Sequence, residues 1–313
     1  MSSNKSGAGL KISGLLNINK PQDITSRQVV NQIQKLIKPA RVGHAGTLDP
    51  LATGVLVLCT GSNTRLIRFI QQQPKEYIGE FILGKRSDTD DMTGEISDTH
   101  DCRTVTQQEL EECLPTFQGR IKQIPPQYSA VHIDGRRAYD LARRGKSFEI
   151  QPREVDVYEI ELLDFSFPRF QLRIVCGSGT YIRSIGRDLG EQLGVGATMS
   201  ALVRTRIGPF TLNSAMELDE ELSVGMIAQN LQSAVLAVEQ LPHYHCDARE
   251  LLSLSQGQKL NCKPEQFPTT PEIIEVAVIC PQGSLSAIAE WDPDEQQLSP
   301  RQVFHPAPGA HQN

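Results

Sequence analysis

The chain has 313 residues and a net charge of −6, and it is long enough for one large or two modest domains with a sizeable core. No apolar run approaches the roughly 20 residues of a membrane-spanning helix, and the N-terminal residues lack the apolar core of a signal peptide, so we expect a cytoplasmic protein. The seven cysteines are scattered without a C-x-x-C pair, which argues against both a disulfide framework and a zinc site.

The charges are unevenly distributed along the chain. Residues 1–80 carry a balance of +6 and residues 119–210 a balance of +4, whereas residues 81–118 carry −6 and residues 211–313 carry −10. The two basic segments could face phosphate groups, although an uneven solvated surface would give the same pattern. Charge alone therefore leaves a nucleic-acid partner open.

The N-terminal part predicts a strand followed by a helix. We expect residues 1–11 to be disordered and G-L-L-N-I-N at 14–19 to form a short strand. Either Thr25 or Ser26 then caps a helix whose apolar residues recur at helical spacing, and Pro39 ends that helix.

A loop rich in glycine presents a single carboxylate, Asp49, within R-V-G-H-A-G-T-L-D-P-L-A-T-G-V-L-V-L-C-T-G at 41–61. Pro50 biases Asp49 away from helical dihedral angles, and the apolar run at 55–58 predicts a buried strand. Catalytic groups often lie on loops that a rigid scaffold holds in place. The alternative interpretation is an Asx-turn before a strand.

A short helix at 64–72 and a strand at 75–84 follow. The strand, K-E-Y-I-G-E-F-I-L-G, alternates so that Tyr77 lies on one face. A tyrosine in a strand usually packs within the sheet, but its flat ring and its hydroxyl also suit stacking on a base. The acidic stretch at 88–95 lacks the spacing of a calcium loop, and we expect a solvated hairpin turn there.

A basic segment lies in the middle of the chain. After a helix opened by the capping box T-x-x-E at 106–109, residues 123–145 pair a stiff proline turn with a helix. Five cations gather on this helix and its flanks: Arg136, Arg137, Arg143, Arg144 and Lys146. The segment could contact phosphates, while an arginine-rich solvated helix is the alternative.

Two antiparallel strands, at 154–167 and 170–176, lead through a Gly-Ser-Gly turn to a helix that starts at Thr180. Arg183 falls in the first turn of this helix. A cation there opposes the helix dipole, so we expect Arg183 to have an anionic partner, although a surface arginine is the alternative.

The stretch G-H-A-G-T-L-D-P-L-A-T-G-V-L at 43–56 resembles the signature of the TruB family of tRNA pseudouridine synthases. Ala45 stands where many members have threonine, a position that is not expected to touch the chemistry. The resemblance implies that Asp49 is the catalytic nucleophile and that Arg183 pairs with it. It also implies that Tyr77 stacks on the target uracil and could assist its deprotonation.

The same resemblance, which covers about residues 14–210, implies roles in substrate binding. His44 would fill the space left by a flipped base, Tyr181 would line the nucleotide pocket, and Leu202 would lie against the base. Lys20 would support the catalytic loop, and the basic helix would contact phosphates. The predicted substrate-binding residues are His44, Tyr181, Leu202, Lys20, Arg143 and Arg144.

The fold that the resemblance implies is mixed α/β (α+β). It is the pseudouridine-synthase fold, a large mixed or antiparallel sheet flanked by helices, followed by a small C-terminal β-rich PUA-like domain. We place the catalytic domain at 12–241 and the PUA-like module at 242–306, between the disordered residues 1–11 and a loose tail at 307–313. The acidic balance from residue 211 onward argues against strong phosphate binding by the module.

The implied activity is isomerisation of uridine-55, in the T loop of the TΨC arm of tRNA, to pseudouridine. The implied partner is the tRNA T stem-loop, and no cofactor, metal or obligate protein partner is implied. A non-catalytic RNA-binding or tRNA-folding protein on the same scaffold is one alternative, and activity on other RNA uridines is another. A carboxylate-dependent hydrolase would need a second acid near Asp49, which residues 24–75 do not supply. The sequence leaves open whether Asp49 attacks C1′ or C6.

Overall fold

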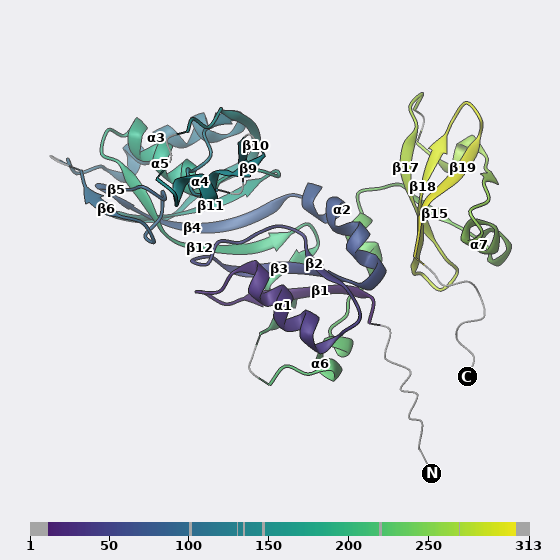
Figure 1. Ribbon diagram of the computed structural model, residues 1–313. Coiled ribbons are helices and arrows are strands. Elements are labelled where there is room, and N and C mark those ends of the chain that lie inside the picture. The colour runs from purple at the N-terminus through teal and green to yellow at the C-terminus, as the bar shows by residue number, and fades with distance from the viewer. Residues whose placement is uncertain are drawn as a thin grey trace, which may run out of the picture.

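The chain is organised by one large sheet and one smaller C-terminal sheet (Figure 1). The predicted disordered segment 1–11 and the predicted tail 307–313 lie outside the residues that the structure describes. The structure, a computed structural model, describes residues 12–99, 102–129, 131–133, 135–145, 148–218, 221–268 and 270–304.

The large sheet has ten strands: β1 Gly14–Lys20, β2 Val42–His44, β3 Thr53–Thr60, β4 Lys75–Leu83, β7 Gly119–Gln123, β10 Arg153–Ser166, β11 Arg169–Cys176, β12 Ala197–Ile207, β13 Phe210–Thr211 and β14 Met216–Glu217. Its main path runs β14-β1-β3-β12-β4-β11-β10-β7, with β2 beside β3 and β13 beside β12. The pairs β12–β3 and β1–β14 are parallel and the other pairs in this sheet are antiparallel. The predicted mixed sheet is therefore confirmed.

Helices cover this sheet and its ends: α1 Ser26–Leu36, α2 Ile67–Gln72, α3 Gln107–Cys113, α4 Ala138–Ala142, α5 Ile182–Gln192 and α6 Val224–Gln229. Short 3₁₀ segments lie at η1 Gly61–Leu66, η2 Leu114–Phe117, η3 Leu212–Ser214 and η4 Ala234–Val238.

As predicted, Thr25 caps α1, and the apolar stripe of this helix packs against β1 and β3. The buried stripe of α5, which includes Ile185 and Leu189, packs in the core that β4, β11 and β12 share. None of the described helices combines the length and apolar character needed to cross a membrane.

The basic segment differs from the predicted helix. A short hairpin lies within this segment, formed by β8 His132–Ile133 with β9 Arg136–Arg137, and an earlier hairpin is formed by β5 Lys85–Ser87 with β6 Ile96–Asp98. Gly135 turns the β8–β9 hairpin with a φ of +78°, a conformation that glycine adopts readily, so the chain before α4 forms a strand. Arg136 and Arg137 therefore lie on β9, Arg143 and Arg144 directly follow α4, and Lys146 lies outside the described residues.

The second sheet forms a C-terminal β-rich part, in agreement with the predicted fold class. Its five strands follow the order β15-β17-β18-β19-β16. Their bounds, with those of the adjoining helices, are β15 His243–His245, α7 Ala248–Ser255, β16 Leu260–Asn261, η5 Pro264–Gln266, β17 Ile274–Ile279, β18 Leu285–Asp292 and β19 Gln297–Val303. Ala277 and Ile279 of β17 share a buried cluster with Phe69 of α2, and Arg68 pairs with Glu275. This sheet thus packs on the α2 side of the large sheet (Figure 1).

Candidate active site

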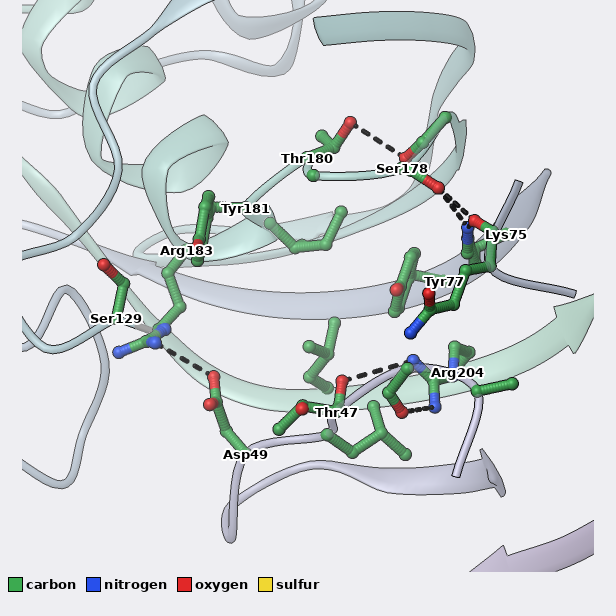
Figure 2. Close-up of a pocket in the computed structure, with 18 of the residues that line it drawn as sticks. Thr47, Asp49, Lys75, Tyr77, Ser129, Ser178, Thr180, Tyr181, Arg183 and Arg204 are labelled. Carbon is green, nitrogen blue, oxygen red and sulfur yellow. Dashed lines mark hydrogen bonds and ion pairs between the residues drawn. The ribbon is translucent and has the colours of Figure 1, made fainter. Parts of the chain in front are cut away.

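A cavity of about 520 Å³ opens between the Asp49 loop, strands β4 and β12, and the turn that precedes α5 (Figure 2). Five of the predicted site residues line it: Asp49, Tyr77, Tyr181, Arg183 and Leu202. Segments that are far apart in the sequence supply these side chains. The fold therefore gathers the predicted catalytic trio at one cavity.

Asp49 and Arg183 form an ion pair within the cavity, with Oδ2 of Asp49 3.0 Å from Nη2 of Arg183. The arginine side chain is only 6% exposed, whereas the aspartate side chain is 39% exposed and faces the cavity. Burial raises the pKa of Asp49 above its usual value, and the guanidinium of Arg183 opposes that rise without cancelling it. The net direction differs from the lowered pKa expected from the ion pair alone, because removal of water from the carboxylate outweighs the attraction.

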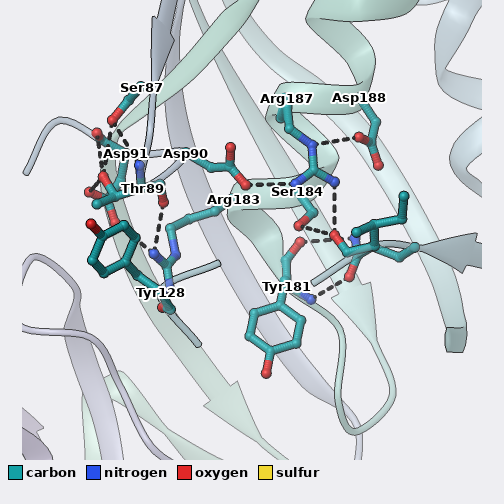
Figure 3. Close-up of polar contacts among 12 residues, drawn as sticks. Ser87, Thr89, Asp90, Asp91, Tyr128, Tyr181, Arg183, Ser184, Arg187 and Asp188 are labelled. Atoms are coloured by element: carbon teal, nitrogen blue, oxygen red, sulfur yellow. Dashed lines mark hydrogen bonds and ion pairs between the residues drawn. The ribbon is translucent and has the colours of Figure 1, made fainter. Parts of the chain in front are cut away.

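A second carboxylate, Asp91, also holds Arg183 (Figure 3). Nη1 of Arg183 lies 3.1 Å from Oδ2 of Asp91 and donates to the carbonyl of Thr89, while Nη2 donates to the carbonyl of Tyr128. The other oxygen of Asp91 accepts bonds from the Thr89 hydroxyl and from the backbone and hydroxyl of Thr93. The guanidinium is thus fixed in one orientation, with one nitrogen directed toward Asp49.

The hairpin turn predicted at 88–95 is present between β5 and β6, but the expectation that its acidic residues are solvated is wrong for Asp90 and Asp91. Asp91 is 2% exposed and Asp90 is 9% exposed, and Asp90 pairs with Arg187, one helical turn after Arg183. The acids are buried because α5 presents two arginines to them. The sequence did contain a signal, since a first-turn arginine needs an anion and the acidic stretch could supply one.

The loop that carries Asp49 is held from two directions. Ser26, at the start of α1, accepts a hydrogen bond from the backbone N–H of Leu48 at 2.8 Å and donates to the carbonyl of the same residue. From β12, the buried Arg204 donates to the carbonyls of Gly46, Thr47 and Val55. Arg204 was not predicted from the sequence, because its contacts with the Asp49 loop depend on the pairing of β3 with β12.

Tyr77 and Leu202 lie on the neighbouring strands β4 and β12, where Tyr77 is opposite Arg204 and Leu202 is opposite Gly79. The guanidinium carbon of Arg204 is 6.0 Å from the centre of the Tyr77 ring. Burial raises the pKa of the Tyr77 phenol, so its hydroxyl stays protonated at neutral pH. The cavity thus presents a flat ring, an apolar side chain and a carboxylate to one ligand.

The remaining predicted residues are not part of the cavity lining. Lys20 is fully buried, and its ammonium group donates to the carbonyls of Pro21, Ile24 and Pro50. It does not line the cavity as a substrate-binding residue would, but it contacts the carbonyl of Pro50, which directly follows Asp49. Burial lowers the pKa of Lys20 to about 8.

His44 and the two arginines lie near the cavity lining. His44 ends β2 directly before the lining residue Ala45, and burial lowers its pKa, so the imidazole is neutral. The guanidinium of Arg143 packs 4.4 Å from the ring centre of Tyr139, which lines the cavity, and Arg144 is exposed. Neither arginine lines the cavity itself.

Two family models match consecutive parts of the chain. Residues 34–182 match the TruB family pseudouridylate synthase N-terminal domain, and residues 183–241 match the tRNA pseudouridylate synthase B C-terminal domain. Together they span the ten-stranded sheet from the end of α1 onward, and they include every residue of the cavity lining.

Curated relatives match most of the chain. A tRNA pseudouridine synthase B of Dehalococcoides mccartyi is 39% identical over 297 residues, which are 92% of this chain and 98% of that protein. One of Microcystis aeruginosa is 42% identical over 251 residues, or 79% of this chain and 84% of that protein. Among solved structures, a chain of a Cbf5–Nop10–Gar1 complex superimposes with a TM-score of 0.70 at 25% identity, covering 94% of this chain and 85% of the other.

Proposed function

The chain belongs to the TruB family of pseudouridylate synthases, and from this membership we propose that it isomerises uridine-55 in the T loop of tRNA, with Asp49 as the nucleophile. The observation that carries the proposal is the 3.0 Å pair between Asp49 and Arg183 at the cavity that Tyr77 and Leu202 also line. A single positioned carboxylate beside a flat aromatic ring suits a nucleobase rearrangement that needs one nucleophile.

The reaction cuts the bond between N1 of uracil and C1′ of ribose and forms a bond between C5 and C1′. Asp49 attacks C1′ or C6, the freed uracil turns within the cavity, and its C5 carbon joins C1′. The proton on C5 is then lost, N1 gains a proton, and Asp49 is released unchanged. Atoms and electrons balance within the nucleoside, so the enzyme contributes positioning, a nucleophile and proton transfer.

Arg183 orients Asp49 and favours its ionised form. The partial burial that raises the pKa of Asp49 also makes the carboxylate a stronger nucleophile than a fully solvated one, because it removes part of the water that would stabilise the charge. The attraction of Arg183 opposes the rise in the pKa and favours the ionised carboxylate that the attack requires. Asp91 acts on Arg183 and does not face the substrate, since both of its oxygens are already used.

Tyr77 stacks on the target uracil, and Leu202 contacts the same base from β12. The phenol is protonated at rest, so its oxygen can take the C5 proton only while its own proton passes on to N1 of the uracil, directly or through water. The hydroxyl thus suits proton transfer after the new C–C bond has formed.

The target must leave the stacked T loop to reach Asp49, at a cost of a few kcal/mol. His44, next to the cavity lining, would occupy the space that the base vacates, and its neutral imidazole suits contact with stacked bases. Tyr181 would line the pocket around the nucleotide. Arg143 and Arg144 would contact the phosphates of the T stem-loop, on the side of the cavity where Tyr139 lies.

Tritium release from tRNA labelled with [5-³H]uridine tests the proposal. We expect release by the wild-type protein and none above background by Asp49→Asn, which keeps the shape of the side chain without its charge. A tRNA in which cytidine replaces uridine-55 tests the position, and it should abolish release. Release by Asp49→Asn at the parent rate would refute the nucleophile, and release from the cytidine-55 tRNA would refute the target.

A further inference from the structure

Lys75 is a buried cation that the proposed mechanism does not use. It begins β4, is 6% exposed, and lines the same cavity as Asp49. Its ammonium group donates to the carbonyl of Gln71 and, at 2.8 Å, to the hydroxyl of Ser178. Among the residues that the structure describes, no carboxylate forms an ion pair with it.

The strand alternation explains why Lys75 lacks an acidic partner. Glu76, the neighbouring residue, points to the opposite face of β4, where it pairs with Arg173 and Arg206. Cys176 lies opposite Lys75 in the register of β11, and burial raises the pKa of this thiol to about 11, so it is neutral. The described part of the chain therefore supplies no compensating charge for this cation. Burial lowers the pKa of Lys75 to about 8, which leaves it mostly protonated at neutral pH.

Lys75 and Ser178 lie at one end of the cavity, and Asp49 and Arg183 lie at the other, with Tyr77 between them (Figure 2). Ser178 is exposed and belongs to the Gly-Ser-Gly turn before α5. Gly179 in that turn has a φ of +85°, and no heavy atom lies within 4 Å of the position that a Cβ would occupy. This end of the cavity is thus open to a ligand that approaches along the backbone of the turn.

We propose that Lys75, held in place by Ser178, binds a phosphodiester that flanks the flipped nucleoside, and this inference rests on the proposed function. With uracil on Tyr77, the open turn at Gly179 gives the sugar-phosphate backbone beside the nucleoside access to Lys75. A phosphate there supplies the negative charge that the buried ammonium lacks, while the Ser178 hydroxyl, which accepts from Lys75 and donates to the carbonyl of Gln71, holds the ammonium in place. Lys75 is then a positioning residue that fixes the nucleoside relative to Asp49.

The test combines a protein variant with a change in the RNA. T-stem-loop hairpins are made with a neutral methylphosphonate in place of the phosphodiester on the 5′ or on the 3′ side of the target uridine. The nucleotide before the changed linkage carries 2′-O-methyl ribose, as does a matched hairpin with the normal linkage. Dissociation constants are measured by filter binding in the Asp49→Asn background, which prevents turnover. Lys75→Met is a suitable variant, because a side chain of similar length replaces a buried charge with an apolar group.

We expect the methylphosphonate on one side to weaken binding by about 10-fold when Lys75 is present, and to have no effect on binding by Lys75→Met. Lys75→Met alone should weaken binding of the normal hairpin by the same factor. Ser178→Ala should show part of the effect. The exposed Lys35→Met, on α1 and outside the cavity, should retain the full sensitivity to the methylphosphonate.

Equal sensitivity of Lys75→Met and of its parent protein to both methylphosphonates would overturn the inference. In steady-state kinetics with Asp49 intact, Lys75→Met should raise KM and leave kcat close to the parent value, because a phosphate contact is made equally in the ground state and the transition state. A fall in kcat at unchanged KM would also overturn it, since that would place Lys75 at the reacting base. Tritium release by the wild-type protein tests the proposed function separately. If the wild-type protein releases no tritium, the proposed function fails. If it does release tritium, but the effects of Lys75→Met and of the methylphosphonate on binding simply add, this inference alone fails.

Discussion

Oδ2 of Asp91 lies 3.1 Å from Nη1 of Arg183, the guanidinium nitrogen that Asp49 does not use. One arginine thus joins an acid that faces the cavity to an acid that is buried behind it. Because the buried acid accepts three further hydrogen bonds, it cannot turn toward a substrate. Its effect on chemistry must pass through the orientation of Arg183.

The first prediction concerns this arrangement. Asp91→Asn should lower kcat by about 10- to 100-fold, because the guanidinium loses the charge that fixes it, while RNA affinity changes little. It should also destabilise the protein by about 2 kcal/mol, since one partner of a buried pair is removed. Tritium release and thermal unfolding measure the two effects. Asp98→Asn is the control, because it breaks an exposed pair with Lys85 that is worth little. A parent-like kcat for Asp91→Asn would refute the orienting role.

The second prediction concerns pH. The pKa of Asp49 is raised in the folded protein, so the folded state binds this proton more tightly than the unfolded state does. The ionised Asp49 therefore lowers the free energy of unfolding. This loss grows as the pH rises from the unfolded-state pKa to the folded-state pKa, and it is absent at a pH below the unfolded-state pKa. We expect Asp49→Asn to unfold at a higher temperature than the wild type at pH 8, with a difference that shrinks in acid. Asp164→Asn, an exposed change on β10, should show no such trend.

The same shift predicts the acid limb of activity. Because the nucleophile must be ionised, kcat/KM should fall as the pH drops through the pKa of Asp49 in the free enzyme. The midpoint should lie above the ordinary value for an aspartate, about 3.9. A midpoint at or below that value would contradict the dominance of burial over the Arg183 ion pair.

The third prediction separates stacking from proton transfer at Tyr77. Tyr77→Phe keeps the ring and removes the hydroxyl, so RNA affinity should stay within about twofold of the parent. If the hydroxyl carries the C5 proton, kcat should fall by about 100-fold or more. Tyr77→Leu, which removes the ring, should weaken binding as well. Full turnover by the Phe variant would exclude the hydroxyl from proton transfer.

Much of the fold could be predicted from local patterns. The capping residue Thr25, the strand around Tyr77 and the buried strand after Asp49 all follow from spacing and turn residues, and the structure has them. The basic segment was harder, because Gly135 permits a hairpin that interrupts the expected helix. Periodicity over so few residues does not distinguish a short hairpin from the first turn of a helix.

The site was predictable only where a motif marks it. Asp49 lies in a long signature, but Asp91 and Arg204 act through contacts that cross the fold. Asp91 reaches Arg183 from a position 92 residues earlier, and Arg204 reaches Val55 from 149 residues away. Their local sequences resemble an acidic turn and a strand, which carry no signal for these partners. Residues 242–306 as a separate module remain a prediction.

The fourth prediction concerns the phosphate contacts proposed for Arg143 and Arg144. Reversal of both to Glu should weaken binding of the T stem-loop and flatten its dependence on salt, because fewer counterions are released. The value of kcat at saturating RNA should stay close to the parent, since neither side chain lines the cavity. Filter binding across a salt series measures the slope. Unchanged curves would remove these residues from the interface.

The fifth prediction tests how the Asp49 loop is held. Arg204 is buried and its guanidinium reaches three carbonyls, those of Gly46, Thr47 and Val55. Arg204→Lys keeps the positive charge but cannot span these acceptors, because an ammonium group lacks the planar fork of a guanidinium. We expect kcat to fall by about 10-fold and the amides of the loop to exchange hydrogen faster, with RNA affinity and its salt dependence preserved.

Arg206→Lys provides the matched control for that change. Arg206 lies two residues further along β12, and it pairs with Glu76, which points away from the face that carries Lys75 and Tyr77. This variant should leave both kcat and loop exchange near the parent values. Faster loop exchange together with a lower kcat in Arg204→Lys alone would tie the rate to the position of the carboxylate. An unchanged kcat despite faster exchange would instead mean that Ser26 and Lys20 suffice to hold Asp49 in place.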